Sequence, residues 1–178
     1  MSNDTEFIIQ ETVKLLNIDS PTGYTDDAAE FVLTELRALG YAPTKTRKGG
    51  VLVDLGGADA ENGVMLETHL DTLGGMVAEI KSNGRLRLTN IGGMNANNAE
   101  AENVRVVTKF DGKYEGTLQL TDASVHVNGD YSTTARAWEK MEVVLDENVS
   151  SADDVRALGV SAGDFVCFDP RTRVTEKG

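Results

Sequence analysis

The sequence lacks the features that several classes of protein require. Its 178 residues include one cysteine, Cys167, so no internal disulfide can form, which suits a reducing compartment. Lysine and arginine number 17 against 29 acidic residues, and a formal charge of −12 argues against binding nucleic-acid phosphates or an anionic membrane surface. No apolar run approaches the roughly 18 residues of a membrane span, and no signal-peptide pattern opens the chain. We therefore expect a soluble, acidic, cytoplasmic protein that binds neither nucleic acid nor membranes.

Several motifs of catalysis and cofactor binding are also missing. The glycine pairs match neither a phosphate-binding loop nor the dinucleotide-binding fingerprint, and no Gly-x-Ser-x-Gly motif occurs. With two histidines and one cysteine, the chain cannot build a closed zinc site from nitrogen and sulfur ligands alone. Any metal site must therefore use mostly carboxylates or be incomplete within this chain.

The first part of the chain predicts two amphipathic helices followed by short strands. Apolar residues recur at helical spacing over residues 6–18 and 26–39, and the sequence SPTGY at 20–24 breaks the chain between them. Two apolar segments are then predicted as strands: residues 49–57, which glycines bound, and residues 64–71, which begin apolar and end polar. Helices that lead into short apolar strands are typical of the start of an α/β layered domain.

From residue 72 onward the pattern changes to many short strands. Asn-Gly at 83–84 and Asp-Gly at 111–112 each lie between β-type runs, which is the turn chemistry of a hairpin. Further strands are predicted over residues 123–127, 141–146 and 163–169. Short strands at such even spacing indicate a small antiparallel barrel or sandwich.

His69 is the first candidate for a functional residue. It lies at the polar end of a predicted strand, where α/β proteins usually place their active sites. Asp71 follows two residues later, so in a strand the imidazole and the carboxylate would project to the same side. A carboxylate that accepts from one ring nitrogen holds a histidine ready to bind metal through the other. Taken alone, a structural histidine paired with a nearby acid is the simpler interpretation.

Three other reactive side chains are given structural interpretations. Glu67 shares the side of His69 in the predicted strand and is interpreted as a solvated acid. His126 alternates with valines and is interpreted as a face residue of a strand in the β-rich region. Cys167 has no positive neighbour in the sequence that would lower its pKa, so a buried and inert thiol is expected.

The segment Thr68–Met94, THLDTLGGMVAEIKSNGRLRLTNIGGM, resembles the signature of the glutamyl-aminopeptidase and deblocking-aminopeptidase family, the tetrahedral-assembly metallopeptidases. The likeness extends in collinear order through residues 20–24, 102–108 and 150–170, and so covers nearly the whole chain. The resemblance implies an enzyme that removes N-terminal residues from peptide substrates with two divalent metal ions, zinc or cobalt.

The resemblance also implies an α/β/α catalytic domain interrupted by an inserted antiparallel β-barrel, through which the family forms homo-oligomers. Residues 1–71 would be the first part of the catalytic domain, 72–168 the inserted barrel, and 169–178 the return segment. His69 takes the position of the first metal ligand, and Asp71 that of the catalytic acid that orients it. The other ligands of the family follow the insert, so the resemblance implies an N-terminal portion that is inactive alone.

Two other interpretations stay open. Zinc exopeptidases and deacylases of a second family share a similar His-x-Asp motif, but their extra domain enters later, whereas here the β-rich region begins directly after Asp71. The chain is alternatively a non-catalytic dimerisation module, because the barrel is the assembly element of the family it resembles. Aminopeptidase activity of this chain with added zinc or cobalt, assayed beside the full-length product, would exclude the module.

Overall fold

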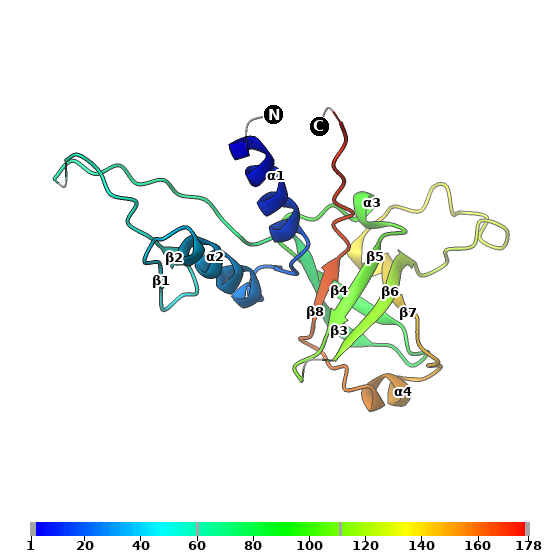
Figure 1. Ribbon diagram of the computed structural model, residues 1–178. Helices are drawn as coiled ribbons and strands as arrows, with labels where there is room; N and C mark the ends of the chain where they lie inside the picture. Colours follow the sequence, from blue (N-terminus) through cyan, green and yellow to red (C-terminus); the bar gives the residue numbers. More distant parts are fainter. Residues whose placement is uncertain (1–2, 60, 111, 177–178) are drawn as a thin grey trace. The chain divides into compact units, whose positions relative to one another are not determined.

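The computed structural model describes residues 3–59, 61–110 and 112–176. The chain divides into two compact units: residues 1–71 together with 172–178, and residues 72–171. We call the first the helical unit and the second the barrel unit. Each is described by itself, with its elements labelled in Figure 1.

Six antiparallel strands close the barrel unit. They follow the ring order β3-β4-β7-β6-β5-β8, and β8 pairs with β3 to complete the ring. Figure 1 shows these strands wrapped around a common interior. The predicted antiparallel barrel is therefore confirmed. The strands are β3 Gly74–Ile80, β4 Leu86–Ile91, β5 Asn103–Val107, β6 Lys113–Leu120, β7 Met141–Leu145 and β8 Phe165–Phe168.

The interior of the barrel is filled by alternate residues of its strands. Because side chains alternate between the two faces of a strand, Val104 and Val106 of β5 and Leu118 of β6 all point inward, and each is 0% exposed. Gly116 marks a close approach between β6 and β7, since a Cβ there would lie 2.6 Å from the main-chain oxygen of Val144. Only glycine fits at that crossing.

Local turn and cap chemistry sets the ends of the barrel's elements. Gly84 has a φ of 79°, which favours glycine, and the Asn83 side chain accepts a hydrogen bond from the Arg85 N–H at 3.1 Å. The predicted β3–β4 hairpin is thus confirmed, and β5 pairs with β6 as predicted. Asp111, half of the second predicted turn, lies outside the described residues.

Three short helical segments complete the barrel unit: α3 (Ala96–Ala99), α4 (Ala152–Ala157) and the 3₁₀ turn η1 (Trp138–Lys140). A capping box starts α4, and the Ser-x-x-Asp spacing that it uses is a local pattern of the sequence. The hydroxyl of Ser151 accepts from the Asp154 N–H at 3.2 Å, and the Asp154 carboxylate accepts from the Ser151 N–H at 2.9 Å.

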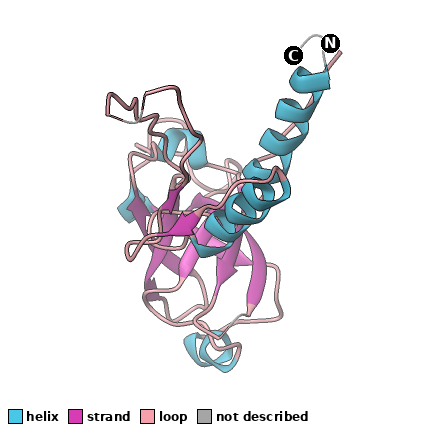
Figure 2. Cartoon of the chain, turned by 60° about the vertical axis from the view of Figure 1, so that its left-hand side comes forward, coloured by secondary structure: helices cyan, strands magenta, loops and turns pink. Residues whose placement is uncertain are grey.

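The helical unit contains the two longest helices, α1 (Asn3–Leu16) and α2 (Asp26–Ala38), drawn in cyan in Figure 2. Both were predicted from apolar spacing. Ala28, Ala29 and Leu33 of α2 are buried, but α1 has no buried residue among those described. Two-residue strands, β1 (Thr44–Lys45) and β2 (Val51–Leu52), pair after α2. None of the described helices combines the length and apolar character needed to cross a bilayer.

The predicted strand over residues 64–71 is wrong. This segment has no strand, and its apolar side chains Val64, Met65 and Leu66 are 88%, 78% and 86% exposed. A strand requires a neighbour that pairs its backbone groups, and in the described part of the chain nothing pairs with this segment as a ladder. For a related reason, the strand predicted over residues 49–57 shrinks to the two residues of β2.

The predicted strand over residues 123–127 is also wrong. These residues form turns in the connection between β6 and β7, where the Asn128 N–H donates to the Ser124 carbonyl at 2.9 Å. His126 is therefore exposed in a turn and is not a face residue of the barrel. Cys167, by contrast, is 2% exposed on β8, as the interpretation of a buried thiol required.

Candidate functional site

His69 presents one ring nitrogen to solvent and the other to Asp71. Its side chain is 84% exposed, and its Nδ1 lies 3.2 Å from Asp71 Oδ1 and 2.9 Å from the Asp71 main-chain oxygen. Both of these atoms accept hydrogen bonds, so in the neutral imidazole Nδ1 carries the proton and Nε2 keeps its lone pair. The segment is not part of a sheet, yet the i, i+2 spacing still brings the two side chains together.

The carboxylate of Asp71 is held at both of its oxygens. Thr22 Oγ1 donates to Oδ2 at 2.6 Å, while Oδ1 faces His69. The hydrogen bond from Thr22 is the main cause that lowers the pKa of Asp71. The backbone of Asp71 and the interaction with His69 lower this pKa further, whereas burial of the carboxylate raises it. Asp71 is therefore ionised at neutral pH and can act as the acceptor that a metal-binding histidine needs.

The turn at residues 20–24 carries Thr22 to this place. The Tyr24 N–H donates to the Pro21 carbonyl at 2.7 Å, and Gly23 has a φ of 97°, the third position where a type II turn requires glycine. Ser20 is 2% exposed, and its hydroxyl donates to the main-chain oxygen of Leu70 at 3.1 Å. The turn is thus tied to the residue that precedes Asp71.

The described residues offer one side chain that is placed to coordinate a metal ion. His69 offers an exposed Nε2, which is the arrangement of a histidine ready to coordinate. Among residues 3–59, 61–110 and 112–176, no group of three or more histidine, cysteine or acidic side chains could enclose a metal ion. Glu67 is exposed, as its interpretation as a solvated acid anticipated. Among the described residues, His69 is the single candidate for a metal ligand.

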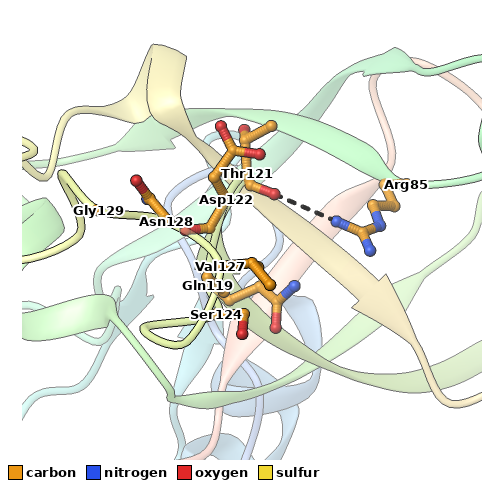
Figure 3. A pocket seen from close by; sticks show the side chains of 9 residues that line it. Arg85, Gln119, Thr121, Asp122, Ser124, Val127, Asn128 and Gly129 are labelled. Atoms are coloured by element: carbon orange, nitrogen blue, oxygen red, sulfur yellow. Dashed lines mark hydrogen bonds between the residues drawn. The ribbon is translucent and has the colours of Figure 1, made fainter.

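The barrel unit also carries a cavity of about 620 Å³, shown in Figure 3. Arg85 lines it and donates to the Thr121 main-chain oxygen at 3.4 Å. The same guanidinium pairs with Glu142, a fully buried carboxylate that Lys81 also contacts at 2.6 Å. Arg85 is thus committed to balancing a buried charge of the barrel, and we assign the cavity no ligand.

Comparison with known proteins identifies the family. The model of the M42 glutamyl aminopeptidase family matches residues 49–178. This chain belongs to the M42 family. The match confirms the resemblance drawn from the Thr68–Met94 segment and decides between the two enzyme families that share a His-x-Asp motif.

Curated relatives extend the M42 likeness toward the start of the chain. The chain is 39% identical over 165 residues to YhfE of Bacillus subtilis (strain 168), provisionally named an aminopeptidase, covering 93% of this chain and 48% of that protein. It is 22% identical over 166 residues to the glutamyl aminopeptidase of Lactococcus lactis subsp. cremoris (strain MG1363), covering 92% and 46%. The chain therefore spans about half the length of these curated relatives.

Solved aminopeptidase structures share the M42 fold seen here. An aminopeptidase from the archaeon Desulfurococcus kamchatkensis superposes with a TM-score of 0.78 at 23% identity, covering 90% of this chain and 42% of that one. The TET1 peptidase of Pyrococcus horikoshii, described as assembling into a tetrahedron or a large octahedral shell, gives 0.73 at 23% identity, covering 90% and 46%. This likeness is one of fold, and it confirms the predicted fold class: the first part of an α/β domain followed by an antiparallel β-barrel.

Proposed function

We propose that this chain is the N-terminal portion of an aminopeptidase that uses two divalent metal ions, zinc or cobalt, to hydrolyse N-terminal residues from peptides. Membership of the M42 family supports the reaction class. The observation that carries the metal site is the pairing of His69 Nδ1 with Asp71, which leaves Nε2 exposed. His69 is proposed as a metal ligand and Asp71 as the acid that orients it.

Each residue has a distinct task in this proposal. A divalent ion supplies a Lewis acid and lowers the pKa of a bound water. His69 donates the lone pair of Nε2 to that ion. Asp71 accepts a hydrogen bond from Nδ1–H, which holds the ring in the required tautomer and orientation.

We expect this chain to be inactive when it is assayed alone. A catalytic zinc ion takes about three protein ligands, whereas the family resemblance assigns a single ligand, His69, to this chain. Aminopeptidase turnover on a peptide p-nitroanilide, with zinc or cobalt added, measures this directly. Activity in the isolated chain would contradict both this expectation and the alternative of a purely structural module.

Substitution of His69 in the complete aminopeptidase tests the proposed site. We expect His69→Ala to lose metal, measured by elemental analysis, and most peptide turnover. Asp71→Asn keeps the shape of the side chain but removes its charge, so we expect a loss of roughly 10- to 100-fold in metal affinity or rate. His126→Ala, which removes the other histidine of the chain, is the matched control and should retain full metal content. Full metal content and normal turnover in His69→Ala would make His69 a structural residue.

We further propose that the barrel unit mediates homo-oligomerisation. Two observations support this: the barrel has its own closed core, and a solved peptidase of similar fold is described as assembling into large shells. Sedimentation of the chain at micromolar concentration tests the proposal. A folded chain that stays strictly monomeric would contradict it.

A further inference from the structure

We propose that Thr22 is a positioning residue of the candidate metal site. Its hydroxyl fixes the carboxylate of Asp71, and Asp71 in turn fixes the ring of His69. This inference rests on the proposed function, because it assigns Thr22 a role in the site where His69 would bind a metal ion.

The geometry at Asp71 shows how the hydroxyl acts. A carboxylate turns easily about its last side-chain bond, since that torsion has broad minima. Here Oδ2 accepts from Thr22 at 2.6 Å and Oδ1 lies 3.2 Å from His69 Nδ1, so both oxygens are engaged. The contact of 2.6 Å lies within the range of charge-assisted O–H···O⁻ bonds, which are stronger than neutral ones. Thr22 therefore sets the plane of the carboxylate that His69 faces.

The ring of His69 depends on that plane because its two partners are unequal. The main-chain oxygen of Asp71, at 2.9 Å from Nδ1, is neutral, whereas Oδ1 at 3.2 Å belongs to an anion. Without Thr22 the carboxylate can turn, and Oδ1 no longer stays beside Nδ1, so the ring keeps the neutral acceptor but loses the charged one. A carboxylate beside the second ring nitrogen orients an imidazole and strengthens it as a metal ligand. The expected effect of removing the hydroxyl is therefore a weakened site that still exists.

The turn that carries Thr22 is fixed to the same segment at a second point. Ser20 is buried and donates to the main-chain oxygen of Leu70 at 3.1 Å, one residue before Asp71. The bond from the Tyr24 N–H to the Pro21 carbonyl closes the turn between them. The proline and glycine of this turn are enough to end the helix, and a hydroxyl at position 22 is not needed for that. The hydroxyl is accounted for by the contact it makes with Asp71.

Three variants of this chain separate positioning from a general effect on folding. Thr22→Val keeps the shape of the side chain and removes the hydroxyl, while Thr22→Ser keeps the hydroxyl. Thr34→Val, at an exposed position on α2, is the matched control. ¹⁵N NMR of the imidazole reports which ring nitrogen carries the proton. We expect Thr22→Val to shift His69 toward the Nε2–H tautomer, and both other variants to match the unmodified chain.

The same variants in the complete aminopeptidase give a second readout. We expect Thr22→Val to weaken metal binding about tenfold, measured by competition with a chelator, at the lower end of the range for groups that orient metal ligands. Thr22→Ser should restore the affinity, and the KM for peptide should not change. An unchanged tautomer and unchanged metal affinity in Thr22→Val would overturn the role of Thr22 alone. Full metal content in His69→Ala would instead overturn the proposed function, whatever the NMR shows.

Discussion

The two units differ in how far their own residues cover their apolar side chains. In the barrel unit, Val104, Val106 and Leu118 are 0% exposed inside a ring of paired strands. In the helical unit, Ile8 of α1 is 62% exposed and the residues from Val64 to Leu66 are 78–88% exposed. A barrel encloses its own core, whereas an amphipathic helix needs a further surface against its apolar stripe. We therefore expect the stability of the chain to reside mainly in the barrel.

Two alanine substitutions, one in each unit, give the largest expected difference in the free energy of unfolding. Leu118→Ala removes a fully buried side chain from the barrel and should lower the free energy of unfolding by about 2–5 kcal/mol. Ile8→Ala on exposed α1 should change it by less than about 0.5 kcal/mol. Urea unfolding followed by the fluorescence of Trp138, which packs against the barrel core, and by circular dichroism measures both. Equal losses would refute the comparison.

A second pair contrasts a buried charge with an exposed one inside the barrel unit. Glu142 is 0% exposed and pairs with Lys81 and Arg85, so Glu142→Gln leaves two cations facing a neutral amide. Because these cations are partly exposed and can rehydrate, we expect a loss of about 1–3 kcal/mol, below the full cost of breaking a buried pair. Glu79→Gln breaks an exposed pair with Arg87 and should cost less than about 1 kcal/mol. Thermal unfolding of both variants decides whether burial sets the difference.

The smallest expected effect is a pH dependence within the barrel unit. The Arg136 guanidinium holds both carboxylate oxygens of Glu100, at 2.7 and 3.1 Å, and lowers the pKa of Glu100 from its ordinary 4.5. A carboxyl whose pKa is lowered by folding stabilises the fold above its unfolded pKa and loses that contribution as pH falls through its folded pKa. The advantage of the unmodified chain over Glu100→Gln should therefore be constant at neutral pH and shrink below about pH 4.5, by less than about 1 kcal/mol in all.

Urea unfolding of the unmodified chain and Glu100→Gln between pH 3 and 7 measures this dependence. Tyr131 also donates to Glu100 at 3.0 Å, so Tyr131→Phe should reduce the same advantage without removing the charge pair. Parallel pH profiles for the unmodified chain and Glu100→Gln would show that the pair does not contribute to stability.

The sequence predicted best where the signal is local. Asn83 and Gly84 make a hairpin turn from their own side chain and backbone, and Ser151 caps α4 within four residues. A strand, by contrast, exists only with a partner, so the apolar pattern of residues 64–71 predicted a strand that the described residues do not form. Residues 123–127 have the same kind of pattern, but their backbone forms turns, in which the N–H groups of Val127 and Asn128 donate to the Ser124 carbonyl.

Only the local part of the candidate site could be predicted from the sequence. The spacing of His69 and Asp71 is visible in the sequence, and their proximity survives although the expected strand does not form. The contact of Thr22 with Asp71 joins residues 49 apart in the chain, and a threonine beside proline and glycine is ordinary turn composition. No local pattern marks such a contact, so only the folded chain shows it.

Closure of the barrel also governs how two copies of this chain can meet. β3 pairs with β4 on one side and β8 on the other, and each described strand of the ring has a partner on both sides. In the proposed homo-oligomer, contact through the barrel would fall mainly to loops and outward side chains, such as Phe110 and Val127, which are 80% and 85% exposed. Single surface substitutions at such positions would then strengthen or weaken the association of copies without disturbing the strand pairing of the barrel.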